Sequence, residues 1–397
     1  MSGGIIFGQI ITILVSPILT RLYTPEEMGI WGLFLSFVSI ASTVGTLRYD
    51  VAIVAAKKEK EALLITQSLL YCITLITTVV FGCVFIFLYR YNIFGYSVFP
   101  RWAILIIILG LIATVWSGIL RYWAMRKAAF ATIGSFSVIQ SLFRALGQII
   151  FAFTGSFGLL FGDIIGRLAG VAVLWRTLPR LKKTWCSKKI LIKYRAYPFI
   201  QLPSSFLDNL AMMAPVPIFT AVYGTVVGGE LTLAQRVVFL PLTLIGSAIA
   251  DVFYSRVAQI VRKDVSILES FLLKIMLRLT ILSLFLGAFL WFFAPRLVLV
   301  IFGSSWERSG WMVKAMVPWL FFLLVVNPVS RIVFLSRYMW VKIFYDLISL
   351  LVITLPLYLH INDPIKSLWL ISWLKAMQLI FYMLFLLVIV RRGAFYG

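Results

Sequence analysis

Long apolar runs alternate with short polar segments along the whole chain. About 20 consecutive apolar residues form a helix long enough to cross the hydrocarbon core of a membrane, so the pattern predicts an all-α polytopic membrane protein with about 12 transmembrane helices. The predicted spans cover residues 3–21, 29–49, 62–89, 102–123, 131–153, 157–177, 198–221, 229–252, 268–293, 309–334, 340–359 and 367–390.

The composition of the 397-residue chain agrees with this prediction, because 62% of the residues are hydrophobic and only 13% are charged. Soluble domains average about 45–50% apolar and about 25% charged residues, so a chain of this composition could not cover its own surface in water. Soluble enzymes, disordered tails and secreted disulfide scaffolds are therefore excluded.

The chain is strongly basic, with 36 Lys and Arg residues against 14 Asp and Glu residues and a net charge of +22. Such a balance indicates a nucleic-acid partner in a soluble protein, whereas in a membrane protein the cytoplasmic loops collect Lys and Arg. With a cytoplasmic N-terminus, about 21 basic residues fall at inner loops and helix ends and about 7 at outer ones. The charge therefore predicts orientation, with both termini cytoplasmic and no nucleic-acid partner.

One long hydrophilic segment, from Arg176 to Arg195, divides the chain nearly in half and is its densest basic stretch. We interpret it as a cytoplasmic linker over residues 179–197, between an N-terminal six-helix lobe (1–178) and a C-terminal six-helix lobe (198–397). Its basic residues are expected to set the orientation of the protein in the membrane and to contact anionic lipid head groups. The alternative is a binding site for a specific partner.

The two halves repeat weakly. Each half has an even number of predicted helices, so both run in the same direction, as expected for lobes related by a pseudo-two-fold axis along the membrane normal with a binding site between them. Matching residues lie at an offset of 200: Pro17, Ile18, Thr20, Tyr23, Gly29 and Leu33 match Pro217, Ile218, Thr220, Tyr223, Gly229 and Leu233.

Polar side chains inside the predicted spans are candidates for function, because a charge at the bilayer centre costs about 2.5–3.5 kcal/mol on insertion scales. In the span 131–153, the spacing places Gln140, Arg144 and Gln148 on one helix face together with two serines. We interpret this face as the wall of a cavity. The alternative is a structural arginine that hydrogen-bonds across to a neighbouring helix.

The span 157–177 carries a ridge of small residues, which permits close approach of a neighbouring helix and is assigned to packing. Asp163 and Arg167 lie on the adjoining face as an i,i+4 pair. We expect this pair to be structural, with the two charges neutralising each other. The ridge consists of four glycines at a spacing of four: Gly158, Gly162, Gly166 and Gly170.

Three further charges lie deep in the spans of the second half. Asp208 lies about 15 Å from the inner end of the span 198–221, and Arg236 lies at a comparable depth in the next span. They form either a cross-helix ion pair or a cationic site with a titratable neighbour. Gln235 is another polar residue of the same span as Arg236. Lys375 is too deep in the last span for easy snorkelling, so it is a candidate for the lining of a site.

Arg48 and Asp50 lie near the inner end of the second span, where Asp50 continues a face of serines and threonines. Within the predicted spans, about eight cations face about four carboxylates, and each uncompensated charge is costly there. An anion that enters the site would offset this cost. The excess therefore favours an anionic substrate with a phosphate or pyrophosphate head group.

The sequence lacks the motifs of several enzyme classes. It has neither a Gly-rich Lys-Ser/Thr phosphate loop nor a Gly-x-Ser-x-Gly nucleophile elbow, and its one histidine, His360, makes a histidine-based metal site unexpected. We expect no enzyme, no metal and no cofactor. A membrane-embedded polysaccharide polymerase stays as an alternative that would need a long periplasmic loop. A drug or cation extruder is another, and would need an acidic cavity.

Six motifs are spread along the chain. They are SPILTRLYTPEEMGIWGLFLS (Ser16–Ser36), LRYDVAIV (Leu47–Val54), GLLFGDIIGR (Gly158–Arg167), YPFIQLPSSFLDNL (Tyr197–Leu210), LAQRVVFLPLTLIGSAIADVF (Leu233–Phe253) and IFGSSW (Ile301–Trp306). Their order resembles that of the Wzx-like oligosaccharide flippases of the multidrug/oligosaccharidyl-lipid/polysaccharide (MOP) exporter superfamily. The resemblance covers essentially the whole chain.

The resemblance implies a V-shaped, MATE-like pair of six-helix lobes around a cationic cavity. Members move undecaprenyl-diphosphate-linked repeat units from the cytoplasmic to the periplasmic leaflet of the bacterial inner membrane, for O-antigen, capsule or exopolysaccharide. Matched motif by motif, Arg21 and Arg48 take arginine positions of the first hairpin, and Arg236 belongs to the LAQR motif. Asp163 and Arg167 belong to the GD-x-x-GR motif.

The first span departs from the family pattern, because its apolar run begins almost at Met1 whereas relatives usually have a short basic lead. No small-residue cleavage site follows it, so we expect it to stay as a helix and not to be removed as a signal peptide. The next residues predict the cap and first turn of the following helix: Thr24, Pro25, Glu26 and Glu27.

The residues and the resemblance together define a candidate site without a cofactor. Expected partners are a lipid-linked oligosaccharide and membrane lipids, with polysaccharide polymerase and chain-length proteins as further candidates. Asp208 and Asp50 are candidates for coupling to a proton or sodium gradient. The candidate substrate contacts are Arg21, Arg48, Gln140, Arg144, Gln235, Arg236 and Lys375.

Overall fold

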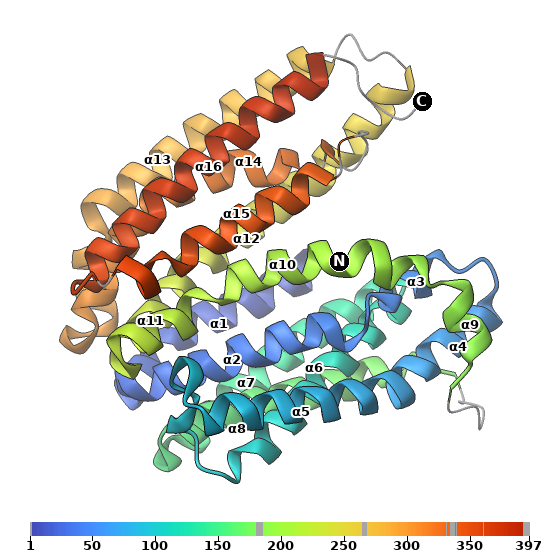
Figure 1. The fold of residues 1–397 in the computed structure, drawn as a ribbon, viewed down its shortest axis with the longest axis horizontal. Coiled ribbons are helices and arrows are strands. Elements are labelled where there is room, and N and C mark those ends of the chain that lie inside the picture. Colours follow the sequence, from blue (N-terminus) through green and yellow to red (C-terminus); the bar gives the residue numbers. More distant parts are fainter. Residues whose placement is uncertain are drawn as a thin grey trace. The chain divides into compact units, whose positions relative to one another are not determined.

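The structure is a computed structural model of the chain and describes residues 2–179, 186–263, 268–330, 332–333, 338, 340–359 and 361–391. These residues form helices joined by short connections, and no strand occurs among them. They divide into two compact units, residues 1–229 and residues 230–397, each made of packed helices (Figure 1).

The first unit contains the helices up to α11. A π-helical turn, Leu69–Ile73, joins α4 to α5 without a break, and another, Tyr197–Gln201, leads into α10. The helices are α1 (Ser2–Leu22), α2 (Pro25–Gly45), α3 (Tyr49–Ala55), α4 (Glu59–Ser68), α5 (Thr74–Arg90), α6 (Ala103–Arg126), α7 (Phe130–Ile150), α8 (Ser156–Trp175), α9 (Lys188–Lys193), α10 (Leu202–Met213) and α11 (Pro215–Tyr223).

The second unit is built from long helices, and α12 begins in the first unit and continues into the second. Within this unit α14 packs between α13 and α16, and α15 packs on α16 (Figure 1). The helices are α12 (Thr225–Lys263), α13 (Leu268–Phe302), α14 (Glu307–Ser330), α15 (Trp340–Leu359) and α16 (Pro364–Arg391).

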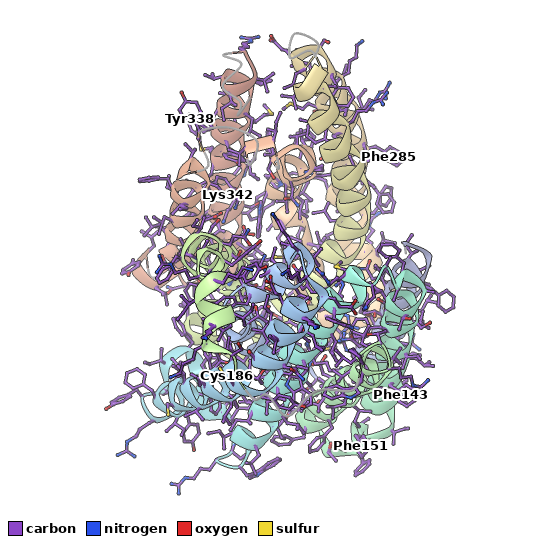
Figure 2. All side chains as sticks on the ribbon, turned by 90° about the vertical axis from the view of Figure 1, so that its right-hand side faces the viewer. Phe143, Phe151, Cys186, Phe285, Tyr338 and Lys342 are labelled. Carbon is purple, nitrogen blue, oxygen red and sulfur yellow. The ribbon has the colours of Figure 1, made fainter. Side chains whose placement is uncertain are left out.

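Ten helical segments in the described part of the chain are long and apolar enough to cross a membrane. The bent pair α10 and α11 would be an eleventh, and the remaining predicted span, 229–252, lies within α12. Every predicted span therefore overlaps a helix, and the predicted all-α membrane fold is confirmed. Large apolar side chains such as Phe285 and Phe143 point away from the bundles, as a lipid-facing surface requires (Figure 2).

The start of α2 is fixed by its local sequence. The backbone N–H of Glu27 donates to Oγ1 of Thr24 over 3.3 Å, and the backbone N–H of Thr24 donates to Oε2 of Glu27 over 2.7 Å. These reciprocal bonds form a capping box, and Pro25 occupies a position whose backbone N–H would have no partner within the helix. The predicted cap is confirmed.

The prediction for the inner end of this span is wrong, because α2 stops at Gly45. Leu47 and Arg48 have left-handed backbone conformations, with φ of 47° and 57°, and such residues cannot continue a right-handed helix. Asp50 therefore lies on the separate short helix α3 and does not extend the polar face of α2.

The glycine ridge of α8 packs closely against α7. A Cβ atom at Gly162 would lie 2.4 Å from the backbone nitrogen of Gln148, and one at Gly166 would lie 2.6 Å from the carbonyl oxygen of Gln140. Atoms cannot approach so closely, so only glycine permits this contact and the predicted packing role is confirmed.

A second glycine contact joins α2 to the beginning of α12. A Cβ atom at Gly29 would lie 2.0 Å from the carbonyl oxygen of Thr225, and one at Gly229 would lie 1.7 Å from that of Pro25. The two glycines are equivalent positions of the weak repeat. The repeat itself stays a prediction.

The helices α10 and α11 belong to the first unit, where both pack against α2. They meet at an angle of 41° next to Pro215, which removes a backbone donor from the helix. Because α10 and α11 belong to the first unit, the boundary between the two compact units lies between Gly229 and Glu230, after the basic segment.

The predicted lobe organisation, 1–178 and 198–397 around a linker at 179–197, stays a prediction. The middle of that linker, residues 180–185, lies outside the described residues. The single histidine, His360, lies outside them as well.

Candidate functional site

A polar cavity of about 340 Å³ lies in the first unit beside the turn between α2 and α3. Its charged residues are Arg48 from the turn, Asp50 from α3 and Arg121 from α6. Hydroxyl groups of α2 and α6 and the side chain of Gln140 on α7 complete the polar lining. The cavity thus offers two guanidiniums and one carboxylate among neutral donors and acceptors, which suits an anionic ligand.

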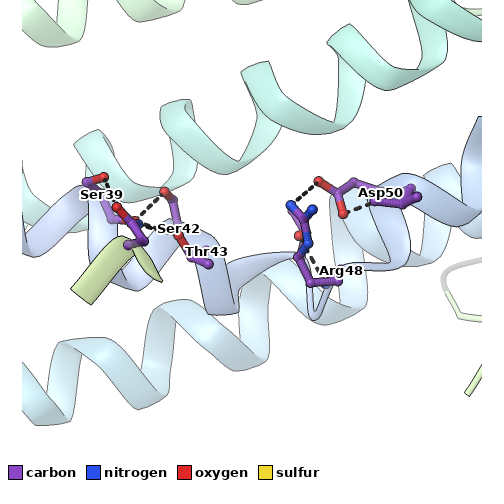
Figure 3. Close-up of polar contacts among 8 residues, drawn as sticks. Ser39, Ser42, Thr43, Arg48 and Asp50 are labelled. Atoms are coloured by element: carbon purple, nitrogen blue, oxygen red, sulfur yellow. Dashed lines mark hydrogen bonds and ion pairs between the residues drawn. The ribbon is translucent and has the colours of Figure 1, made fainter. Parts of the chain in front are cut away.

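Arg48 is held by the turn in which it lies. Its backbone N–H donates to Oγ1 of Thr46 over 3.3 Å, and its Nη1 lies 3.8 Å from Oδ2 of Asp50 (Figure 3). Its Nε is buried and has no hydrogen-bond partner among the described residues. A left-handed conformation at a non-glycine residue costs about 1–3 kcal/mol and is typical of functional sites. Here it places the guanidinium of Arg48 in the cavity.

Asp50 is the carboxylate of the cavity and is only 5% exposed. Its Oδ1 accepts a hydrogen bond from the backbone N–H of Val51 over 3.1 Å (Figure 3). Burial raises the pKa of the Asp50 carboxyl above its ordinary value, and the nearby Arg48 opposes this rise. Protonation of Asp50 would leave the two arginines of the cavity without a counter-charge.

The wall of the cavity continues into a polar contact between α2 and α10. The side-chain amide of Asn209 donates to the carbonyl oxygen of Ser39 over 2.9 Å and also hydrogen-bonds the hydroxyl of Thr43, which lines the cavity (Figure 3). The neighbouring Asp208 is exposed. Asn209 therefore connects α10 to the cavity wall, while Asp208 stays a predicted ion-coupling residue.

Arg144 belongs to a buried ion network between α7 and α8. Its Nε lies 2.9 Å from Oδ1 of Asp163, and the Nε of Arg167 lies 2.5 Å from Oδ2 of the same carboxylate. The side chain of Asp163 is fully buried. Arg144 is one helical turn from Gln140 but does not line the cavity, and this geometry matches the structural alternative considered for it above.

The other predicted contacts are not among the residues that line this cavity. Gln235 and Arg236 are half-buried on α12, in the second unit, and Nε2 of Gln235 has no hydrogen-bond partner among the described residues. Lys375 is buried on α16, where it contacts the hydroxyl of Ser349. Arg21 is exposed at the end of α1. Of the seven predicted contacts, the structure brings together Arg48 and Gln140.

One cavity residue, Arg121, is not among the predicted contacts, because its place at an inner helix end indicates membrane orientation. A signal for its role is present, because Thr114, Ser117, Gly118 and Arg121 lie at spacings of 3, 1 and 3 and so share one face of α6. All four line the cavity. Within the described residues, no group of three or more His, Cys, Asp and Glu side chains could hold a metal ion.

Solved transporter structures share this fold, although no curated protein matches the chain in sequence. The chain is similar to the lipid II flippase MurJ in an inward closed conformation, with a TM-score of 0.76 and 15% identity over 96% of this chain and 87% of that one. It is similar to an inward-facing MATE multidrug resistance transporter of the MOP superfamily, with a TM-score of 0.68 and 15% identity over 97% and 95%. For a MOP superfamily transporter from Pyrococcus furiosus the TM-score is 0.56, with 15% identity over 99% and 95%.

The fold of MOP superfamily transporters is therefore confirmed for this chain. A family model described as polysaccharide biosynthesis protein matches residues 18–310, which is most of the chain and includes every residue of the polar cavity. The chain belongs to the polysaccharide biosynthesis protein family.

Proposed function

We propose that the protein is a flippase for undecaprenyl-diphosphate-linked oligosaccharide repeat units. It carries them from the cytoplasmic to the periplasmic leaflet of the bacterial inner membrane by alternating access, for O-antigen, capsule or exopolysaccharide synthesis. The observation that carries this proposal is the polar cavity with Arg48 and Arg121 against the single carboxylate of Asp50, in a chain of a polysaccharide biosynthesis family.

The chemistry of the cavity fits a diphosphate-sugar head. Such a head cannot cross about 30 Å of hydrocarbon unaided, because its charges and hydroxyls would lose their hydration. Guanidiniums bind phosphate oxygens in a bidentate manner, and the serine and threonine hydroxyls offer partners for sugar hydroxyls. Gln140 adds an amide to this set. Arg21, Arg144, Gln235, Arg236 and Lys375 stay predicted contacts.

A drug or cation extruder is the second candidate, and the charge of the cavity argues against it. A site for organic cations would place carboxylates in excess, whereas this cavity has two arginines for one aspartate. The two proposals therefore differ in the charge of the substrate, which is negative for a flippase and positive for a cation extruder.

The test is a flipping assay in proteoliposomes with a defined undecaprenyl-diphosphate-linked oligosaccharide. Wild-type protein should move the lipid between leaflets, while Arg48→Gln and Arg121→Gln should lower the initial rate at least about tenfold, because each removes a charge-assisted contact. Arg90→Gln is a matched control, since Arg90 lies at the far end of α5 and is exposed. Equal rates in all four proteins would overturn the proposal.

A further inference from the structure

The second unit contains an apolar groove of about 440 Å³ that lies between α13, α14 and α16. On α13, groove residues recur at spacings of 3 and 4 from Leu284 to Phe292, and on α14 they do so from Val317 to Phe322. Each set therefore shares one helix face. Every side chain of the lining is apolar, and Trp373 of α16 completes it. Leu284, Phe292 and Trp373 are all more than half exposed, so the groove opens toward lipid.

A lysine lies at one end of this groove. Lys314 precedes Val317 on the same face of α14, and its Nζ lies 5.2 Å from the ring centroid of Trp291, which lines the groove. The ring of Trp311 lies 5.4 Å from the same nitrogen. Among the described residues no carboxylate pairs with Lys314, and the two aromatic faces attract its ammonium group without neutralising it.

Beyond the lysine lies a polar pocket of about 400 Å³. It contains Trp311, the hydroxyls of Ser304 and Ser305, and the carboxylates of Glu230 and Glu307. Trp311 is 43% exposed, so its ring can offer a flat apolar face beside hydrogen-bonding groups. Arg308 also lines the pocket, but it is paired with Glu230 at 3.1 Å and adds no net charge.

The polar pocket, Lys314 and the apolar groove adjoin one another in that order. Trp311 belongs to both the polar pocket and the contact with Lys314, while Trp291 belongs to both that contact and the groove. Lys314 is seven residues inside α14, about 10 Å from its first residue at 1.5 Å per residue. On the predicted orientation α14 begins at the outer face, so the polar pocket lies at the interface and the groove extends toward the bilayer middle.

We propose that the polar pocket, Lys314 and the apolar groove together form one binding site, from Glu230 to Phe322. This site binds a prenyl-diphosphate-linked sugar in the outer leaflet before the protein releases it. The sugar stacks on Trp311 and hydrogen-bonds Ser304, Ser305 and the carboxylates. The phosphate pairs with Lys314, and the first part of the prenyl chain occupies the groove, with the remainder in lipid. This inference rests on the proposed function and names an exit site for the same substrate.

Charge and composition favour this ligand over an ordinary membrane phospholipid. A phospholipid would use the lysine and the groove, but its head group has no sugar ring to stack on Trp311 in the polar pocket. A free sugar would use the pocket and leave the groove empty. An amphiphile in which a diphosphate joins a sugar to a long apolar chain has all three parts in the order in which the structure has them.

The test measures binding of farnesyl-diphosphate-linked N-acetylglucosamine to the full-length protein in nanodiscs. The protein also carries Arg48→Gln and Arg121→Gln, so that the polar cavity beside α2 and α3 does not bind the probe. Lys314→Gln should weaken binding at least about tenfold through loss of a charge-assisted contact. Gly287→Leu should weaken it as well, because a Cβ there meets Val317 at an ordinary 3.5 Å and a larger side chain would fill the groove.

Two comparisons separate the parts of the site. Trp311→Ala should weaken binding of the sugar-bearing probe several-fold and leave binding of farnesyl diphosphate unchanged. Arg296→Gln, an exposed cation on α13, and Gly82→Leu on α5 are the matched controls for Lys314→Gln and Gly287→Leu and should bind like the background protein.

Equal binding by Lys314→Gln, Gly287→Leu and their controls would overturn the exit site. Equally tight binding of phosphatidylglycerol would also overturn it, and would make the groove a phospholipid site. Failure of the proposed function gives a different result: wild-type protein would then not flip the probe in proteoliposomes, whatever the outcome of the binding experiment.

Discussion

Replacement of Asp163 by asparagine should strongly destabilise the first unit. The carboxylate is fully buried and lies 2.9 Å from Nε of Arg144 and 2.5 Å from Nε of Arg167. Asp163→Asn would leave two guanidiniums, which are 22% and 15% exposed, without their counter-charge. Removing one partner of a buried pair costs about 3–5 kcal/mol. For a unit of this size, that corresponds to a fall of about 6–20 °C in the midpoint of thermal unfolding.

The assay is thermal unfolding of purified protein in detergent, followed by intrinsic fluorescence. Glu269→Gln is the control, because Glu269 pairs with Arg391 at a similar distance, 2.7 Å, but both side chains are exposed. An exposed pair contributes about 1 kcal/mol or less. If Asp163→Asn unfolds within about 1 °C of the wild type, the buried network does not stabilise the unit and the reasoning is refuted.

The same network decides how Arg144 is tested. A single Arg144→Gln variant would leave Asp163 with Arg167 alone, so a loss of transport could report a weakened fold. The double variant Asp163→Asn/Arg144→Gln removes one charge of each sign and should recover part of the lost stability. If the stable double variant still flips lipid, Arg144 is structural. If it does not, the predicted substrate contact is supported.

Two further predictions follow from the cavity and from the contact between α2 and α12. The affinity of the wild-type cavity for a diphosphate probe should rise as the pH falls through the raised pKa of Asp50, since protonation removes its only carboxylate. Asp50→Asn should bind more tightly at neutral pH and lose this part of the pH dependence, while titration of the probe itself affects both proteins equally. Gly229→Val should lower the flipping rate at least about tenfold, because its Cβ would lie 1.7 Å from the carbonyl oxygen of Pro25. Gly224→Ala, where nothing lies within 4 Å, is the spatial control, although its φ of +90° adds local strain.

The positions of the membrane helices could be predicted because each is a long apolar run, and hydrophobicity along the chain is a local property. The break after Gly45 could not, because the left-handed turn falls on Leu47 and Arg48, residue types that do not signal it. The partner of Arg144 was also missed. Spacing along one helix relates Asp163 to Arg167, but Arg144 lies on α7 and reaches Asp163 only because the glycines of α8 allow the helices to approach.

We propose that Asp50 links the chemistry of the cavity to the direction of transport. An anion bound beside Arg48 and Arg121 competes with the Asp50 carboxylate for the same positive charges, so binding of the anion raises the affinity of Asp50 for a proton. Linkage is reciprocal, and protonation must therefore raise the affinity for the anion by the same factor. Differences in affinity between inner and outer sites change rates but cannot set a net direction. In the coupling that we propose, Asp50 takes up a proton when the substrate binds in the cavity. It releases this proton in a second conformation of the protein, and the cycle thereby couples flipping to a proton gradient.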